Sequence, residues 1–488
     1  MSTKKNIFYN TLLSVSQLLL PLVTYPYVSR ILGPSALGKI SFIESISQYF
    51  ILFAAIGIPV YSIREFGKLD FNDKKGRDKL FFELFLLHQS FSLFLMCFYI
   101  LLFFILDGND LNPYLYLIGG VMILINPLLI EWYYQSKGKY DFITKRSLIT
   151  KAISAILIFL LIKKQDDFVI YYALFLFSLI MNVLVNLYSF IKEGPVFSYK
   201  NLDFRKHFRP LFLLATTTVV GSIYITLDTF VLGLFSSFEA VGYYSTAIKI
   251  VKLPLSMINA VAIVSLSQVS SAFFKNDLVA VRVNLAKSLK YVLTLSIPLS
   301  FGIGLTAKWV IPLISGSEFL PAVRAVQILS PIIVMIALNY LIFVQLFTPG
   351  HKEKTMLLIT IFGSLVSVCA NLFLVPKFSY IGSAITTTAT EFTILLLCIF
   401  ISKEKFQINF DFDTLIKALI SCILFIPFFY LIDMFDLKDF VKLIICFFSC
   451  VSSYFLIQRF AFKNEIIFVV EEFCLSFFKN KILNDKKF

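Results

Sequence analysis

The sequence predicts an all-α polytopic membrane protein with about fourteen transmembrane helices. Of its 488 residues, 58% are hydrophobic and only 15% are charged, against about 25% in an ordinary soluble domain. The mean hydropathy is +0.84. The apolar residues gather in segments of about 20 residues, the length that a helix needs to cross a bilayer. These observations indicate a bundle of membrane-spanning helices.

Fourteen apolar segments follow one another along the chain. The predicted spans are residues 7–31, 40–66, 80–106, 113–135, 147–162, 168–191, 210–235, 243–272, 288–307, 322–348, 354–375, 379–402, 414–433 and 438–461. The first is too long for the hydrophobic region of a cleavable signal peptide, so we expect it to remain in the protein.

The basic residues show which side of the membrane each connection faces. The net charge is +14, a value that also fits a nucleic-acid-binding protein. With the N-terminus inside, however, the inner connections and helix ends carry 33 of the 44 Lys and Arg residues, and the outer ones carry nine. This asymmetry is the positive-inside rule. It predicts cytoplasmic N- and C-termini, anionic lipid as the nearby partner and no nucleic acid.

A repeat divides the chain into two similar lobes. Leu32-Gly33 and, after four residues, Gly38 follow the first span; Leu232-Gly233 and, after eight residues, Gly242 follow the seventh. Because six spans separate the two copies, both begin inside, as parallel repeats about a pseudo-two-fold axis along the membrane normal. The predicted lobes are residues 1–209, with a cytoplasmic linker, and 210–402, each of six helices. Residues 403–488 add two helices and a basic cytoplasmic tail.

Two lysines lie inside the predicted eighth span. Lys249 and Lys252 share one helical face with Ser245, Ser256 and Asn259, because the spacings are 4, 3, 4 and 3 residues. A charge at the centre of a spanning helix costs about 2.5–3.5 kcal/mol. The face therefore predicts a wet cavity that receives an anionic group. The alternative is that each lysine extends to the nearer membrane surface.

Acidic residues inside the spans are candidates for ion coupling. The three candidates are Glu44, Asp228 and Glu391, and the sequence favours Glu44 because Ser41, Ser45 and Gln48 add oxygens to its helical face. Buried ionisable residues in spanning helices mark ion and substrate pathways. The alternative is structural pairing, of Glu44 with Lys249 or of Asp228 with Arg30.

Three further cations are candidates for binding an anionic substrate. Arg30 and Lys39 flank the outer turn of the first repeat, and Arg64 ends the second span. Together with Lys249 and Lys252 they make up the predicted substrate-binding set.

Motifs for catalysis and for nucleotide binding do not fit. Residues 33–39 match G-x-x-x-x-G-K, but a Walker A loop continues with Ser or Thr, and Ile40 stands there. Neither HExxH nor GxSxG occurs, so we predict no catalytic residue, no metal site and no cofactor. The seven cysteines form no CxxC pair. We expect energy from a gradient of H⁺, Na⁺ or the substrate.

Four stretches carry a family resemblance: residues 25–39 at the first repeat, 131–135 (Glu-Trp-Tyr-Tyr-Gln), 227–233 and 381–384. In this order and spacing they resemble the O-antigen-type polysaccharide flippases of the multidrug/oligosaccharidyl-lipid/polysaccharide (MOP) exporter superfamily. The resemblance extends over about residues 1–402. Two features depart from the family pattern: Ser136 stands where Gly is frequent, and the buried cations of the eighth span are lysines rather than arginines.

The resemblance implies a flippase of the bacterial inner membrane. Such a protein moves an undecaprenyl-diphosphate-linked oligosaccharide to the outer leaflet, with a polysaccharide polymerase and a chain-length regulator as protein partners. Two alternatives stay open. One is a drug/cation antiporter of the same superfamily, which would favour acids and aromatics over central lysines. The other is a membrane polysaccharide polymerase or glycosyltransferase, which would carry a long outer loop or an acidic motif in a soluble domain.

Overall fold

The chain forms two compact units that consist of helices. The structure is a computed structural model that describes residues 3–70, 73–106, 112–195, 202–408 and 410–468, and every regular element among them is helical. The first unit comprises Met1–Ser245, Ile314–Glu318 and Ser367–Ser383, and the second comprises the remaining residues. The basic tail predicted at the C-terminus lies largely outside the described residues. The lobes predicted from the repeat, 1–209 and 210–402, stay a prediction.

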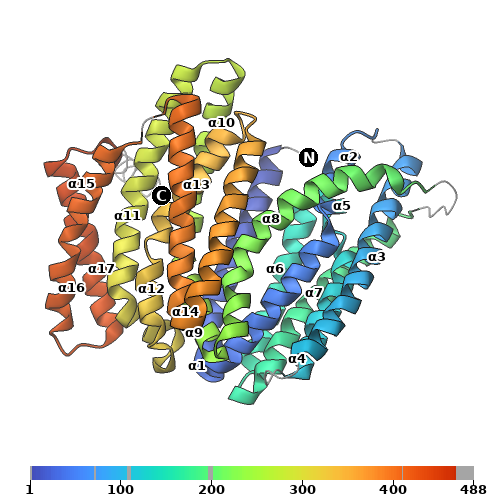
Figure 1. Cartoon of the computed structure of the whole chain (residues 1–488), viewed down its shortest axis with the longest axis horizontal. Coiled ribbons are helices and arrows are strands. Elements are labelled where there is room, and N and C mark those ends of the chain that lie inside the picture. The colour runs from blue at the N-terminus through green and yellow to red at the C-terminus, as the bar shows by residue number, and fades with distance from the viewer. Residues whose placement is uncertain (1–2, 71–72, 107–111, 196–201, 409, 469–488) are drawn as a thin grey trace, which may run out of the picture. The chain divides into compact units, whose positions relative to one another are not determined.

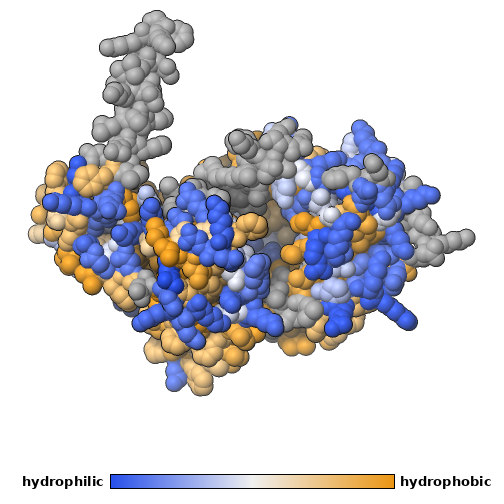
Figure 2. All heavy atoms as spheres, turned by 90° about the horizontal axis from the view of Figure 1, so that it is seen from above, coloured by the Kyte–Doolittle hydropathy of each residue, from blue (hydrophilic) through white to orange (hydrophobic). Residues whose placement is uncertain are grey.

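The helices are those of a multi-pass membrane protein. Among the described residues, eight are long and apolar enough to cross a membrane, or nine if the bent pair Ala322–Leu329 and Ile332–Phe347 is one span. Large apolar side chains such as Phe94, Phe98 and Phe104 are exposed, as expected on a surface that faces lipid. Figure 2 shows one face on which many side chains are hydrophilic, with apolar side chains along its flanks.

The first unit is built from the helices of the N-terminal half. In order they are α1 (Thr3–Ala55), α2 (Ile58–Phe66), α3 (Lys74–Leu106), α4 (Pro113–Ile125), α5 (Glu131–Ser136), α6 (Tyr140–Leu161), α7 (Phe168–Lys192), α8 (Arg205–Phe235) and the start of α9 (Phe238–Lys252). α1 packs against α6, α8, α3 and α4, and α6 packs against α7. Figure 1 shows α3, α4, α6 and α7 in the same part of the molecule.

The predicted connection at residues 32–39 is helical except at one residue. Gly33 adopts φ 71° and ψ 175°, and helical backbone resumes after it. A positive φ is accessible to glycine without steric cost, and Pro34 suits the first position of the following segment. The structure thus joins the two predicted spans through a break at one residue, because Gly33 alone departs from helical geometry and the residues after it are helical. Ser379 makes the corresponding break inside α14 (Glu353–Phe406).

The glycines of the two repeat copies pack against each other's backbone. A Cβ on Gly38 would lie 1.7 Å from the carbonyl oxygen of Phe238, and a Cβ on Gly242 would lie 2.1 Å from that of Pro34. Such distances leave no room for a side chain. The contact is reciprocal, since each copy inserts a glycine against the other copy.

The residues 131–135 form part of an aromatic core. Trp132 stacks on Phe81 with ring centroids 5.4 Å apart, and Tyr133 meets Phe81 edge-on at 5.1 Å. The Tyr134 hydroxyl donates to the carbonyl oxygen of Asn186, 2.7 Å away. The three aromatic residues of the motif therefore pack α5 against α3 and α7.

The second unit contains the remaining helices. They are the end of α9, α10 (Leu255–Phe274), α11 (Leu278–Ser315), α12 (Ala322–Leu329), α13 (Ile332–Ile342), most of α14, α15 (Phe412–Ile423), α16 (Phe425–Asp433) and α17 (Asp439–Leu456). The predicted eighth span, 243–272, is interrupted between Lys252 and Leu255, where Pro254 lacks the N–H that a continuous helix needs. Pro331 separates α12 from α13 in the same way.

Candidate functional site

Asp228 is the centre of a buried polar cluster in the first unit. It lies on α8 and is 4% exposed. Its Oδ2 accepts a hydrogen bond from the Tyr244 hydroxyl of α9 at 2.9 Å, and its Oδ1 accepts one from Asn371 Nδ2 of α14 at 2.6 Å. Asn371 also donates to the Ser367 carbonyl oxygen at 2.9 Å. Three helices that are distant in sequence thus meet at one carboxylate.

One acceptor of this cluster has no hydrogen-bond partner in the described part of the chain. Asn371 is fully buried, and its Oδ1 has no partner among the described residues. A buried amide oxygen without a hydrogen bond is costly. A carboxylate and an amide oxygen are ligands that hard cations prefer. The cluster can therefore hold a small cation or a proton.

Glu44 occupies a more open position on α1. Its residue is half-buried, and its charge interacts with the Tyr171 and Tyr172 hydroxyls of α7. Ser45 is buried and donates to the Phe42 carbonyl oxygen at 2.6 Å. Ser45 therefore satisfies its own helix, and it does not share the accessibility of Glu44.

Glu391 lies in the second unit on α14. It is 4% exposed, and its Oε2 accepts a hydrogen bond from Asn339 Nδ2 of α13 at 2.9 Å. The Oγ1 of Thr390 and the Oδ1 of Asn339 are buried without a partner among the described residues. Glu391 thus has a smaller set of side-chain donors than Asp228.

The two lysines lie in the last turn of α9. Lys249, Lys252 and Ser256 are exposed and Asn259 is half-buried, but Ser245 is buried and donates to the Gly242 carbonyl oxygen at 3.2 Å. Four of the five predicted residues thus remain accessible. Ser245 belongs to the tight glycine contact instead.

The other predicted cations lie on the first unit. Arg30 is exposed, and its Cγ lies 3.3 Å from the position of a Cβ on Gly316. Lys39 is half-buried, with its Nζ 5.7 Å from the centre of the Phe238 ring. Arg64 is exposed and pairs with Glu65 at 3.1 Å. The structure thus distributes these three along α1 and α2 rather than in one cluster.

A carboxylate–histidine–tyrosine chain was not predicted from the sequence. Glu83 of α3 is fully buried and meets His207 Nε2 at 2.9 Å, and His207 Nδ1 meets the Tyr61 hydroxyl at 2.8 Å. Lys206 pairs with Glu83 at 2.8 Å. The position of His207 in a basic run beside an apolar helix was the only signal in the sequence. The chain ties α2, α3 and the start of α8 together.

Glu193 links the end of α7 to α5. It accepts hydrogen bonds from Lys139 Nζ at 2.6 Å and the Tyr133 hydroxyl at 2.7 Å, and it pairs with Lys137. Burial by itself would raise the pKa of Glu193, but these hydrogen bonds and charges outweigh burial and lower the pKa to about 2. Burial also lowers the pKa of Lys137, and Glu193 opposes that shift. The group therefore stays an ion cluster at neutral pH.

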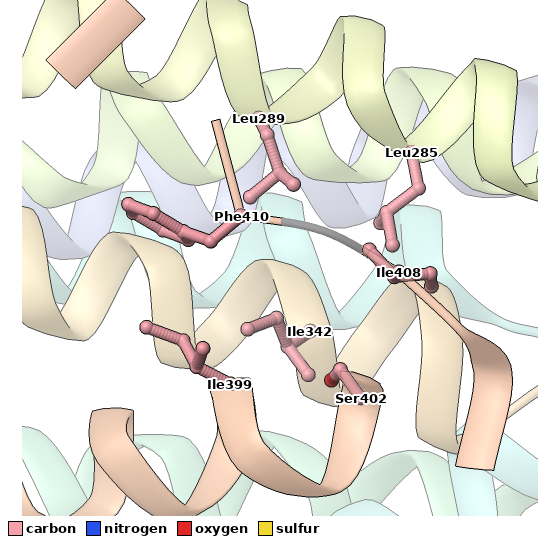
Figure 3. Close-up of a pocket in the computed structure, with 7 residues that line it drawn as sticks. All are labelled: Leu285, Leu289, Ile342, Ile399, Ser402, Ile408 and Phe410. Atoms are coloured by element: carbon pink, nitrogen blue, oxygen red, sulfur yellow. The ribbon is translucent and has the colours of Figure 1, made fainter. Parts of the chain in front are cut away.

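Two cavities of the second unit differ in volume. Figure 3 shows a cavity of about 10 Å³ lined by Leu285, Leu289, Ile342, Ile399, Ser402, Ile408 and Phe410. Such a volume holds one water at most. A second cavity, of about 750 Å³, is an apolar groove between α11 and α17, with Pro298, Gly302, Phe447 and Tyr454 among its residues. Its size and composition suit a hydrocarbon chain.

Among the residues that the structure describes, no group of three or more His, Cys, Asp and Glu side chains could hold a metal ion. The clusters around Asp228 and Glu391 each contain one carboxylate.

Comparison with known proteins identifies the family. Residues 3–267 match the model of the family described as polysaccharide biosynthesis protein. The chain belongs to this family. It is also 24% identical over 413 residues to a protein of Escherichia coli (strain K12) described as an O-antigen transporter, with 83% of this chain and 98% of that protein covered.

Solved structures show the same fold. The lipid II flippase MurJ in an inward closed conformation has a TM-score of 0.76 at 18% identity, with 93% of this chain and 99% of MurJ covered. An inward-facing multidrug resistance MATE family transporter of the MOP superfamily has a TM-score of 0.62 at 15% identity, with 82% and 98% covered. The fold is therefore that of these MOP-superfamily transporters.

Proposed function

We propose that this protein is a flippase that moves an undecaprenyl-diphosphate-linked oligosaccharide from the inner to the outer leaflet of a bacterial inner membrane. The observation that carries the proposal is the match of residues 3–267 to the polysaccharide biosynthesis family. The E. coli relative, described as an O-antigen transporter, and the likeness to a lipid II flippase support it. A polysaccharide polymerase and a chain-length regulator would act with it.

The architecture that we propose has fourteen spans in two six-helix lobes, 1–209 and 210–402, and two further helices. The reciprocal packing of Gly38 and Gly242 supports two related lobes, because corresponding positions of the two copies meet. Alternating access would then consist of movement of one lobe against the other around a fixed site.

The substrate would be held by different surfaces for its two parts. Lys249 and Lys252, with Arg30, Lys39 and Arg64, would attract the diphosphate, because lysine binds phosphate as a point charge and arginine adds paired hydrogen bonds. The apolar groove between α11 and α17 has the dimensions to shelter part of a prenyl chain.

Coupling to an ion would take place at a buried acid. Of the three predicted acids, Asp228 is favoured, because it is buried, is bonded to Tyr244 and Asn371, and lies beside an amide oxygen with no partner among the described residues. A proton or Na⁺ entering there would neutralise the carboxylate. Moving one charge with a potential of 100 mV supplies about 2.3 kcal/mol.

Complementation tests the proposed transport. A bacterial strain that lacks its own flippase should regain surface polysaccharide when it expresses this chain, and the lipid-linked intermediate should move from the inner to the outer leaflet. A chain that inserts stably but leaves the intermediate in the inner leaflet, with several matched polysaccharide pathways tried, would contradict the proposal. Loss of drug sensitivity in the same strain would favour the antiporter.

Labelling tests the proposed orientation. A single cysteine near Ser236 should react with an impermeant reagent added to intact cells, whereas one near Asp73 should react only after permeabilisation. The reason is the excess of basic residues in the connections on the side of Asp73. Labelling near Asp73 in intact cells would refute a cytoplasmic N-terminus.

A further inference from the structure

Two cations of α6, Arg146 and Lys151, have hydrogen-bond donors without partners among the described residues. The Arg146 side chain is 5% exposed, and its Nη2 donates to Glu131 Oε1 at 3.2 Å. Its Nε and Nη1, and also Lys151 Nζ, are buried without a hydrogen-bond partner among the described residues. A buried charged donor without a partner costs several kcal/mol. The pair is therefore complete only when something else accepts these hydrogen bonds.

The two cations share one acidic neighbour. Both interact electrostatically with the Glu131 carboxylate of α5. Two cations and one acid leave a net charge of +1. Ser154 lies one turn after Lys151 on α6, and its Oγ is also buried without a partner in the described part of the chain. An anion with several acceptor oxygens would accept these hydrogen bonds and match the net charge.

The site is open on one side and supported on the other. The Glu131 side chain is 30% exposed, so the charged group has a route to the outside. On the far side, the Thr150 hydroxyl of α6 donates to Asn182 Oδ1 of α7 at 3.1 Å. A guanidinium with a fixed fork of donors on such a braced helix suits a tetrahedral oxyanion.

We propose that Arg146, Lys151 and Ser154 form a binding site for the phosphate group of a lipid. The anion reaches the site either as the diphosphate of the lipid-linked oligosaccharide, a case that rests on the proposed function, or as the headgroup of an anionic phospholipid. Without a bound anion, Glu131 accepts a hydrogen bond from Arg146 Nη2 and so fixes the guanidinium. A bound phosphate accepts hydrogen bonds from Nε and Nη1 of Arg146 and from Nζ of Lys151.

Trp132 supplies a local readout. The chain has two tryptophans, Trp132 and Trp309, and Trp309→Phe leaves only the one next to Glu131. The full-length protein in detergent micelles is titrated with farnesyl diphosphate, with short-chain phosphatidylglycerol and with inorganic phosphate, while Trp132 fluorescence is followed. Farnesyl diphosphate and phosphatidylglycerol separate the two lipid sources, and inorganic phosphate shows what the anion alone contributes.

The variants predict changes in opposite directions. Arg146→Gln and Lys151→Gln should each weaken binding about tenfold or more, because hydrogen bonds to charged groups are lost. Glu131→Gln should tighten it, because it frees Nη2 and raises the net charge. Lys145→Gln, which changes an exposed cation on the same helix, should leave affinity unchanged. Arg146→Lys keeps the charge and should bind between the parent and Arg146→Gln.

The results decide the proposal in either direction. Tighter binding of farnesyl diphosphate identifies the substrate diphosphate as the ligand, and tighter binding of phosphatidylglycerol identifies a phospholipid. Equal affinity in the parent, Arg146→Gln and Lys145→Gln, or weaker binding in Glu131→Gln, would overturn the site. Because Glu131→Gln is expected to gain affinity, misfolding cannot imitate the expected pattern. Complementation would still decide the flippase proposal separately.

Discussion

Replacing Asp228 with Asn isolates the role of its charge. The side chain keeps its size, and the Tyr244 hydroxyl and Asn371 Nδ2, which both donate to the carboxylate, remain in place. The variant lacks the negative charge that would attract a coupling cation. We therefore expect Asp228→Asn to bind no coupling ion at concentrations that saturate the parent.

The magnitude follows from electrostatics at short range. A cation about 4 Å from a carboxylate gains about 4 kcal/mol at an effective dielectric constant of 20. Loss of this energy lowers affinity about a thousandfold. At an ion concentration of about 100 times the parent's Kd, binding stabilises the parent by about 2.7 kcal/mol. The variant should gain close to nothing under the same conditions.

Thermal unfolding of the purified protein measures this difference. The parent's midpoint should rise when Na⁺ replaces choline at constant ionic strength. Glu239→Gln, which changes an exposed acid in the first turn of α9, is the matched control and should respond like the parent. An Asp228→Asn protein that responds like the parent would refute this role, and Glu44 and Glu391 would be next.

Three further outcomes are expected. The double variant Lys249→Ala, Lys252→Ala should lose transport, but its free energy of unfolding should change by less than about 0.5 kcal/mol, because both side chains are exposed. Transport and unfolding are measured on the same preparation, and normal transport would exclude a lysine site. Gly242→Ala should lower the free energy of unfolding by about 1–3 kcal/mol, because its Cβ would lie 2.1 Å from the Pro34 carbonyl oxygen. Gly302→Ala is the control, since a Cβ there meets nothing within 4 Å. Equal melting temperatures of the two variants would contradict the glycine contact. The pKa of Glu193 is lowered from its usual value to about 2, so its contribution to stability is present above about pH 4.5 and is lost as the pH falls toward 2. The free energy of unfolding should therefore depend less steeply on acid pH in Glu193→Gln than in the parent. An unchanged pH dependence would be evidence against the ion cluster.

The membrane class followed from the apolar segments, but the breaks within helices did not. Hydropathy registers the composition of a segment and not its dihedral angles. The sequence placed a connection at residues 32–39, and in the structure this connection is a helix break at Gly33 alone. The predicted polar face of the eighth span assumed an unbroken helix. In the structure, Pro254 interrupts this helix, and Ser245 is buried beside the glycine contact.

The candidate site could be predicted only in part. Asp228 was identifiable because a charge inside an apolar segment is costly. Its partner Asn371 lies 143 residues away, and one sequence carries no signal for such a contact. Arg146 was counted as one of the basic residues of an inner connection, because a sequence does not show which donors lack acceptors. The same holds for Glu83 and His207, which meet across 124 residues.

The most direct test of the central claim is transfer of a lipid-linked oligosaccharide between leaflets by the purified protein. The full-length chain is reconstituted in liposomes that contain a fluorescent polyprenyl-diphosphate oligosaccharide, and a membrane-impermeant reagent quenches or cleaves the sugars exposed outside. We predict that the accessible fraction changes with an imposed ion gradient in liposomes that contain the parent, and that it does not change with Lys249→Ala plus Lys252→Ala. An accessible fraction equal to that of protein-free liposomes, for a well-folded parent with substrates of matched sugar composition, would contradict the account.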